Sequence, residues 1–250
     1  MMRSLSLATL LATLLATPAL PQNGGPSLPE VPFDPGERLQ FSIGYGSLPA
    51  GTMSIQVAGL TRYEDRPAYH IVFDAQTNRA VSFVYELDTH EESWFDAQRF
   101  WSLRYLKRST ENGEQRTRDY RFDQQRSLRI EPDGQTKPAS PRAVDQLAFM
   151  YYIRLLPLKP GAKFVLRNSA DPDDNPVTVR VLKKERVKVP AGTYEAWVLD
   201  LDLTTDSGVF KKGGENRIWI TADERKMPVK ISSKIGLGSF LAELVRSDAG

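Results

Sequence analysis

Two short stretches that nearly repeat one another, Leu48-Pro49-Ala50-Gly51-Thr52 and Val189-Pro190-Ala191-Gly192-Thr193, decide the predicted fold class. Each lies between two runs in which apolar and polar residues alternate. Proline presets φ at an early turn position, and glycine supplies a positive φ. A type I turn followed by a left-handed glycine joins antiparallel strands in a bulged hairpin. The stretches therefore predict an antiparallel β protein whose structural turn residues are Pro49, Gly51, Pro190 and Gly192.

The alternation of apolar and polar residues extends along most of the chain. It is clear from Leu39 to Tyr45, and it returns in sets that begin at Tyr69, Val81 and Trp101. A period of two is the signature of a strand with one buried face. Asn112-Gly113 and Asp133-Gly134 are typical of hairpin turns. We therefore expect about ten or eleven strands between Glu37 and the C-terminal residues.

One segment, residues 140–156, has helical spacing instead. Ser140 and Pro141 suit the N-cap and the first helical position. Apolar residues then recur three and four positions apart and cover most of the circumference until Pro157. Such a helix is buried on more than one side. The sequence thus predicts a mainly β fold: a curved antiparallel sheet forming a barrel or half-barrel, with this helix packed on its concave face.

The N-terminal residues indicate that the protein is exported. Residues 1–19 combine a basic start at Arg3, a short apolar run and a small-residue region near Ala19, which is typical of a cleavable signal peptide. The run is shorter than the roughly 20 apolar residues that span a bilayer, which disfavours the alternative of a retained anchor. A Pro/Gly-rich leader, residues 20–36, precedes a single β-rich domain, residues 37–250. We expect the mature protein in the periplasm or secreted, with no membrane span.

The composition argues against several kinds of site and against one class of partner. The chain has no cysteine, so it has no disulfide, thiolate site or lipoprotein acylation site. Its net charge of +2 is unlike the strongly basic footprint of nucleic-acid binders, so we expect no nucleic-acid partner.

Several phrases along the chain carry a resemblance to a known family. They are Gly36-Glu37-Arg38-Leu39, Arg66-Pro67-Ala68-Tyr69-His70-Ile71, Asp145-Gln146-Leu147, Tyr151-Tyr152-Ile153-Arg154 and Trp219-Ile220-Thr221-Ala222-Asp223-Glu224-Arg225. Together with the two turn stretches, they resemble an uncharacterised family of exported bacterial proteins, domain-of-unknown-function family 3108. This resemblance implies an exported, envelope-associated β domain and supplies no catalytic residues.

The stretch from Trp219 to Pro228 is also similar to the end of bacterial lipoprotein-carrier domains. That second resemblance implies a curved antiparallel sheet wrapped around a helix, with an apolar cavity for acyl chains.

No pattern of catalytic or metal-binding residues stands out. Asp88, His90 and Glu92 alternate on one strand face, but catalytic zinc commonly takes two or more histidines among three protein ligands. His70, the other histidine, lies on the opposite face from its apolar neighbours, and no Gly-x-Ser-x-Gly elbow is present. We expect a hydrated polar face, no metal, no cofactor and no catalytic residue.

Aromatic residues on the sheet and helix suggest a ligand pocket if the sheet does not close fully over the helix. Burying acyl methylenes there would contribute about 0.8 kcal/mol each. The predicted pocket residues are Phe83, Tyr85, Trp101, Tyr105, Tyr151 and Tyr152. A second candidate site is the alternating basic strip Lys184, Arg186 and Lys188, which suits anionic head groups or glycans.

Three functions follow from these observations. The first is a non-enzymatic envelope protein that binds a lipid or another amphiphile. The second is a structural or scaffolding domain with a solid core, which contacts other envelope proteins. The third is an enzyme acting on cell-wall material, for which Asp88 and His90 are the residues to test.

Overall fold

A single antiparallel sheet makes up most of the protein. The computed structural model describes residues 28–206, 210–235 and 238–248, so the predicted signal peptide and residues 20–27 of the predicted leader lie outside the described residues. The described strands are β1 (Arg38–Tyr45), β2 (Leu48–Tyr63), β3 (Arg66–Thr77), β4 (Leu87–Asp96), β5 (Ser102–Glu111), β6 (Glu114–Asp123), β7 (Leu128–Ile130), β8 (Thr136–Pro138), β9 (Lys163–Leu166), β10 (Val177–Val189), β11 (Gly192–Asp202), β12 (Asn216–Thr221), β13 (Pro228–Ile235) and β14 (Gly238–Asp248).

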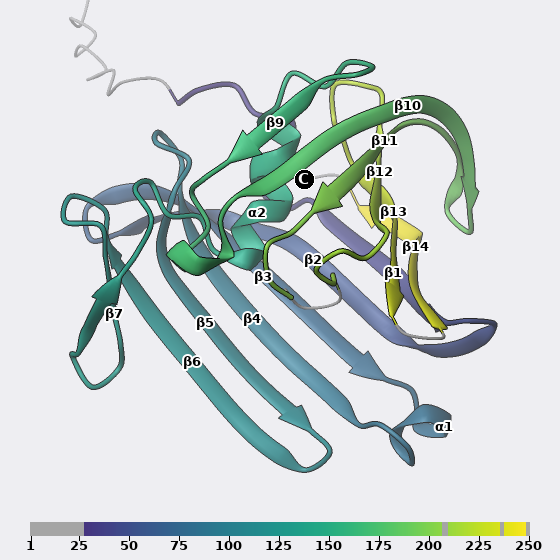
Figure 1. The fold of residues 1–250 in the computed structure, drawn as a ribbon, viewed down its shortest axis with the longest axis horizontal. Helices are drawn as coiled ribbons and strands as arrows, with labels where there is room; N and C mark the ends of the chain where they lie inside the picture. The colour runs from purple at the N-terminus through teal and green to yellow at the C-terminus, as the bar shows by residue number, and fades with distance from the viewer. Residues whose placement is uncertain (1–27, 207–209, 236–237, 249–250) are drawn as a thin grey trace, which may run out of the picture.

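The sheet is strongly curved and does not close. Its order is β8-β7-β6-β5-β4-β3-β2-β1-β14-β13-β12-β11-β10-β9, so that β8 and β9 are its two edges. In Figure 1 the long strands β2–β6 form one broad wall, β9–β12 fold over it, and the main helix α2 lies between them. The predicted half-barrel with a helix on its concave side is confirmed. The described sheet has fourteen strands instead of ten or eleven, because strands as short as β7 and β8 show no readable alternation.

The main helix is shorter than predicted. α2 spans Gln146–Tyr152 and continues as the 3₁₀ turn η1 (Ile153–Leu155), so it begins six residues after Ser140. Its N-cap is Asp145, whose carboxylate accepts hydrogen bonds of 2.9 Å from the amides of Leu147 and Ala148. The preceding residues are extended because they pair elsewhere: Val144 forms an isolated bridge with Ser169. Prediction of the helix is confirmed, whereas the predicted start at Ser140 is wrong.

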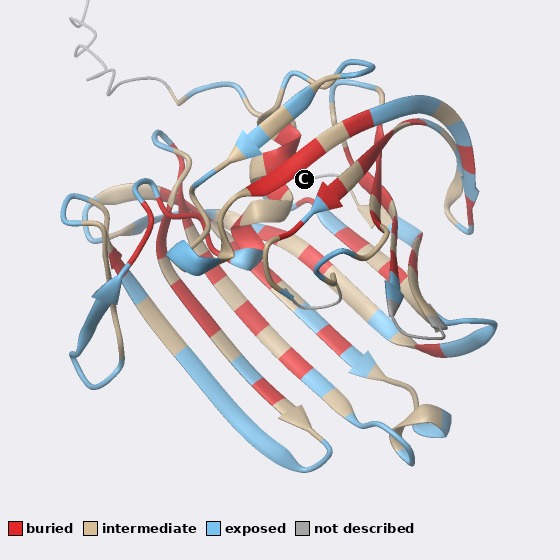
Figure 2. Cartoon of the chain, viewed as in Figure 1, coloured by how far each residue is buried: buried red, intermediate tan, exposed pale blue. Residues whose placement is uncertain are grey.

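The core lies between α2 and the concave face of the sheet. Figure 2 shows buried residues alternating with less buried ones along β3, β4 and β5, and a largely exposed lower half of β6. From the helix, Leu147, Ala148 and Tyr151 are buried, and α2 packs against β3 and β4. The helix therefore fills the upper part of the half-barrel and leaves the lower part of the wall uncovered.

The two turn stretches have different structures. Pro190 and Ala191 form the two-residue loop between β10 and β11, and Gly192 has φ +143°, which confirms the predicted positive φ. Gly51 instead lies inside β2 and is not among the residues with positive φ, so that prediction is wrong. The first hairpin turns three residues before Pro49, at Gly46, where φ is +59°.

The alternating set Val81, Phe83, Tyr85 and Leu87 predicts a strand, and this prediction is wrong for residues 81–86, because only Leu87 lies in a strand, β4. Asn78 caps the short helix α1 (Arg79–Ser82) by accepting a hydrogen bond of 3.0 Å from the Val81 amide. The chain then runs exposed through Phe83 and Val84, which are 84% and 87% accessible. The local cap overrides the alternating pattern, because these residues have no neighbouring strand with which to pair.

A buried ion pair holds one end of the half-barrel closed. The Arg154 guanidinium donates to the Glu37 carboxylate at 2.6 and 2.9 Å, and both side chains are 1% exposed. Arg154 also donates to the carbonyls of Pro32 and Arg225. Phe33 packs edge-on against the Tyr151 ring and is buried, so Phe33 and Glu37 join the core.

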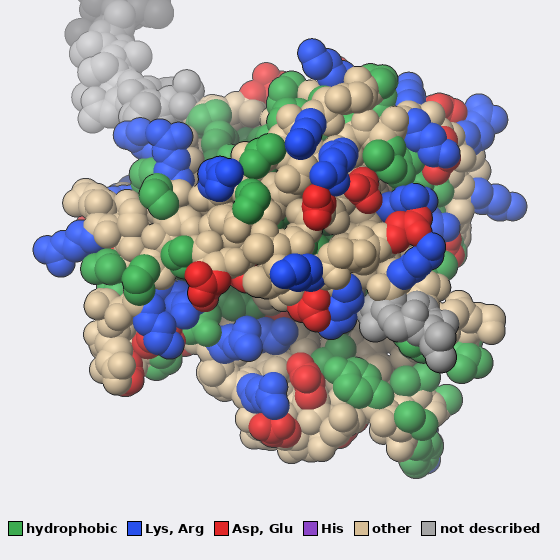
Figure 3. Space-filling model, viewed as in Figure 1, with side chains coloured by type: hydrophobic (Ala, Val, Ile, Leu, Met, Phe, Trp, Pro, Cys, Tyr) green, Lys and Arg blue, Asp and Glu red, His purple; other side chains and the backbone are tan. Residues whose placement is uncertain are grey.

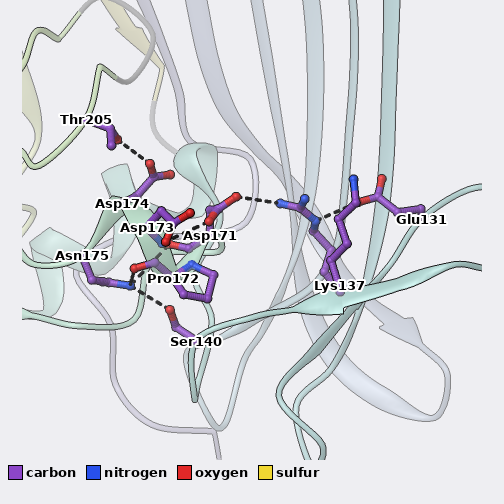
Figure 4. Close-up of polar contacts among 10 residues, drawn as sticks. Glu131, Lys137, Ser140, Asp171, Pro172, Asp173, Asp174, Asn175 and Thr205 are labelled. Carbon is purple, nitrogen blue, oxygen red and sulfur yellow. Dashed lines mark hydrogen bonds and ion pairs between the residues drawn. The ribbon is translucent and has the colours of Figure 1, made fainter.

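A polar loop bridges the gap between the two sheet edges. In Figure 4 the acidic loop around η2 (Pro172–Asp174) contacts partners on both sides. Asp171 lies 3.6 Å from Arg129 of β7, Asn175 donates to Ser140 at 2.8 Å, and Thr205 donates to Asp174. These contacts connect β7, which lies next to the β8 edge, to the segment that enters β10, which lies next to the β9 edge.

Candidate functional site: a cleft with an apolar wall and a polar wall

A cleft of about 590 Å³ lies between the concave face of the sheet and the underside of α2. Its volume falls within the range of small-molecule sites. Figure 3 shows the hollow between the upper lobe and the lower ends of the long strands, with apolar, basic and acidic side chains at its border. The unclosed sheet and the short helix create this space together.

Strands β1–β3 give the cleft an apolar wall. Alternate residues of these strands point to the concave face, and no polar side chain lines the cleft from them. The lining residues are Phe41 and Ile43 of β1, Met53 and Ile55 of β2, and Phe73 and Ala75 of β3. Phe149 and Met150 of α2 cover this wall from above, and Ile231 and Phe240 close it on the β13–β14 side.

Strands β4–β6 give the cleft a polar wall. Glu91, Lys107 and Arg118 are direct partners across the three strands, and all three line the cleft. The Lys107 ammonium lies 3.1 Å from one Glu91 oxygen. The other oxygen accepts hydrogen bonds from the Tyr105 hydroxyl at 2.8 Å and the Gln146 amide at 2.9 Å. Burial beside Glu91 raises the pKa of Tyr105, so this hydroxyl stays protonated and keeps donating.

Asp145 connects the polar wall to the helix. Besides capping α2, its carboxylate accepts hydrogen bonds from Ser93 of β4 and Ser102 of β5. The side chain is buried, and burial raises its pKa although these hydrogen bonds act in the opposite direction. All these partners orient the helix over the cleft, so the role of Asp145 is structural.

The predicted pocket aromatics are only partly at the cleft. Tyr105 and Tyr85 line it. Tyr151 is buried in the core against Phe33, Tyr152 packs beside that core, and Trp101 lies before β5. Phe83 is exposed at the loop after α1. The cleft therefore contains two of the six predicted residues. Most of its apolar lining comes instead from residues of β1–β3.

Sequence reasoning missed the strand residues that line the cleft. The alternation from Leu39 to Tyr45 predicts a strand through Phe41 and Ile43, but nothing in it distinguishes a residue at a cleft from one in a filled core. Lys107 and Arg118 had a weaker signal: they interrupt the inner-face positions of their strands with charge.

The basic strip of β10 lies on the surface. Lys184, Arg186 and Lys188 are exposed as their alternation predicts. Arg186 is paired with Glu195 at 3.2 Å, and the Lys184 ammonium lies over the Trp197 ring. Two of these three cations thus already have intramolecular partners, so the strip is a weaker anion site than its sequence suggests.

The two histidines lie on the face of the sheet opposite the cleft. His90 contacts Asp74 at 2.7 Å and Glu92 at 3.4 Å, and His70 contacts Glu92 at 2.7 Å. Asp88 takes no part in this cluster. Among the described residues, no group of three or more histidine or carboxylate side chains has a geometry that could hold a metal ion.

Comparison with known proteins identifies the family. The family model described as "Protein of unknown function (DUF3108)" matches residues 40–245. The chain belongs to this family. The match confirms the resemblance drawn from the sequence phrases. No curated protein matches this DUF3108 chain.

The fold of the DUF3108 chain is similar to that of a solved β-barrel-like protein. It superimposes with a TM-score of 0.59 on a β-barrel-like protein of domain of unknown function DUF1849 from Brucella abortus, at 11% identity over 87% of this chain and 99% of that one. A hypothetical protein, CT021, from Chlamydia trachomatis matches with a TM-score of 0.39 at 9% identity over 86% and 87% of the two chains. At these identities the first match shows the fold alone.

None of the helices in the described part of the DUF3108 chain has the length and apolar character needed to cross a membrane.

Proposed function

We propose that this protein is a non-enzymatic binding domain of the bacterial envelope that holds the apolar chain of a lipid or another amphiphile. The observation that carries the proposal is the apolar wall of β1–β3, which faces an open cleft beneath α2. Signal-like residues 1–19 support a location in the periplasm or outside the cell.

The energetics favour a ligand with an alkyl chain. Burying about ten methylenes would contribute about 8 kcal/mol at ~0.8 kcal/mol each. Association costs at least about 4 kcal/mol in lost translational and rotational freedom. The balance is at most about 4 kcal/mol, which corresponds to a Kd of about 1 mM, so the alkyl chain alone gives weak and reversible binding.

Native mass spectrometry of protein purified without detergent tests the proposal. We expect adducts with the mass of a lipid, and displacement of a fluorescent fatty acid by dodecanoate. An absence of adducts together with an absence of fatty-acid binding would contradict the proposal. That result would favour a structural domain with envelope protein partners.

A cleft-filling variant sharpens this test. Ala75→Trp places a large ring in the cleft from β3, because Ala75 lines it. Fatty-acid affinity should fall at least tenfold, an effect of about 1.4 kcal/mol. The matched control is Ala58→Trp, which adds the same side chain at an exposed position of β2. Equal loss of affinity in both variants would place the ligand elsewhere.

A further inference from the structure

We propose that the bound amphiphile is anionic and that its head group pairs with Arg118, with Lys107 beside it. This inference rests on the proposed function, because it assigns a polarity to the same cleft. It begins from the row Glu91, Lys107 and Arg118, which crosses β4, β5 and β6 on the face that lines the cleft.

The row places two cations directly opposite one another. Lys107 of β5 and Arg118 of β6 are register partners, and like charges in that position destabilise a sheet. Glu91 compensates Lys107 alone, because its other oxygen is occupied by Tyr105 and Gln146. One positive charge is therefore left over in this row, and the fold gains nothing from it.

Arg118 is the residue that carries this charge. It is exposed, and it forms no ion pair with any residue that the structure describes. Three other arginines of β5–β7 are paired: Arg104 with Asp119, Arg116 with Glu114 and Arg129 with Glu131. Arg108 and Arg121 have no ion pair among the described residues, but unlike Arg118 they do not line the cleft. A guanidinium facing a cleft is suited to hold a carboxylate or a phosphate through two parallel hydrogen bonds.

The acidic residues of the cleft do not compete for this place. Asp145 is saturated by hydrogen bonds, Asp171 faces Arg129, and Asp174 accepts from Thr205. Glu111 lies four residues along β5 from Lys107, which corresponds to about 13 Å along an extended strand. An anion beside Arg118 would thus meet little repulsion.

The order of the strands gives the ligand a direction. The lining is apolar on β1–β3 and becomes charged on β4–β6. Neighbouring strands are about 4.8 Å apart, so β2 and β5 are separated by roughly 14 Å measured along the sheet. A single alkyl chain lying across β1–β3 would therefore bring its head group to Lys107 and Arg118.

Three ligands with the same chain test the inference: dodecanoate, dodecyl phosphate and dodecanol, with affinities measured by isothermal titration calorimetry. We expect one or both anions to bind wild-type protein at least tenfold more tightly than the alcohol, as a charge-assisted contact provides. Arg118→Gln should remove most of this preference and leave alcohol binding unchanged. The better of the two anions identifies a carboxylate or a phosphate head group.

The control is Arg108→Gln, which makes the same charge change on the outer face of β5, at an exposed residue next to Lys107. It should keep the preference for the anions. Equal binding of alcohol and anions by wild type, or equal effects of the two substitutions, would overturn the inference and leave the proposed function standing. Failure of all three ligands to bind would overturn both.

Discussion

Gly51 is required by the space around its α carbon and not by its backbone angle. β2 approaches β3 so closely there that a Cβ atom would lie 2.1 Å from the Gln76 carbonyl oxygen. Backbone atoms cannot move aside as the end of a flexible side chain can. We expect Gly51→Ala to lower the free energy of unfolding by about 1–3 kcal/mol, the usual cost of forcing an extra methyl into packed structure.

Urea denaturation of this variant and of Gly59→Ala measures the effect. Gly59 lies in the same strand, and a Cβ there would meet nothing within 4 Å. The control should therefore change stability much less than Gly51→Ala. A loss at Gly51 no larger than the loss at Gly59 would show that β2 and β3 do not approach each other in this way.

The two turn stretches show when the conformation of a single glycine can be predicted from its neighbours in the sequence. Gly192 was predicted correctly because its hairpin is formed by neighbouring residues alone. Gly51 has nearly the same neighbours in sequence, but its partner is residue 76 of another strand. Only the three-dimensional pairing distinguishes a glycine that turns the chain from a glycine that admits a neighbouring backbone.

At the level of single elements, titratable side chains on the outer face of β3 and β4 contact one another in a row. His90 lies between Asp74 and Glu92, and the hydrogen bond to Asp74, opposed by partial burial, raises the pKa of His90 above its usual value near 6.5. Burial acts to raise the pKa of Glu92, but hydrogen bonds from His70 and His90 outweigh it and lower that pKa.

The sign of the pH effect follows from the raised pKa of His90. The folded protein binds the proton more tightly than the unfolded chain, so the stabilisation is fully present below about pH 6.5 and is lost as pH rises through the folded pKa. An NMR titration of the His90 ring should give a midpoint above 6.5 and a lower one in Asp74→Asn. Asp88→Asn removes a carboxylate that does not contact the ring and should not move the midpoint. An unshifted midpoint in Asp74→Asn would contradict the assignment.

Elements were predictable where their pattern is long and independent of distant residues. The alternation in β1–β3 and the helical spacing after Asp145 predicted the correct elements. The start of α2 was misplaced because Ser140 and Pro141 offer a good local cap, while Asp145 gains partners from both β4 and β5. Residues 83–86 alternate but form no strand, because an alternating segment without a pairing partner does not form one.

At the scale of the whole molecule, the phrases that mark the family meet at the closed end of the half-barrel. Glu37, Arg154 and the Arg225 carbonyl come from three separate phrases and join in one buried contact. Breaking a buried ion pair by removing one partner costs about 3–5 kcal/mol, so Glu37 and Arg154 contribute to the stability of the fold. Neither residue lines the cleft.

The cleft itself was beyond prediction from one sequence. The alternation and the apolar helix predicted a concave face covered by a helix, and two of the aromatic residues named from the sequence line the space. The cleft exists because the helix is short and the sheet leaves its edges unpaired. Both facts depend on contacts between residues far apart in the chain, such as Val144 with Ser169.

NMR of protein labelled at the isoleucine δ1 methyl groups, titrated with dodecanoate, shows whether an alkyl chain binds in the cleft beneath α2. Ile43, Ile55 and Ile231 line the cleft, whereas Ile153, Ile218 and Ile220 are fully buried elsewhere in the core. We expect saturable shifts of the first three methyl signals and little change in the other three. Saturable binding that leaves Ile43, Ile55 and Ile231 unshifted, or no binding at all, would contradict this expectation.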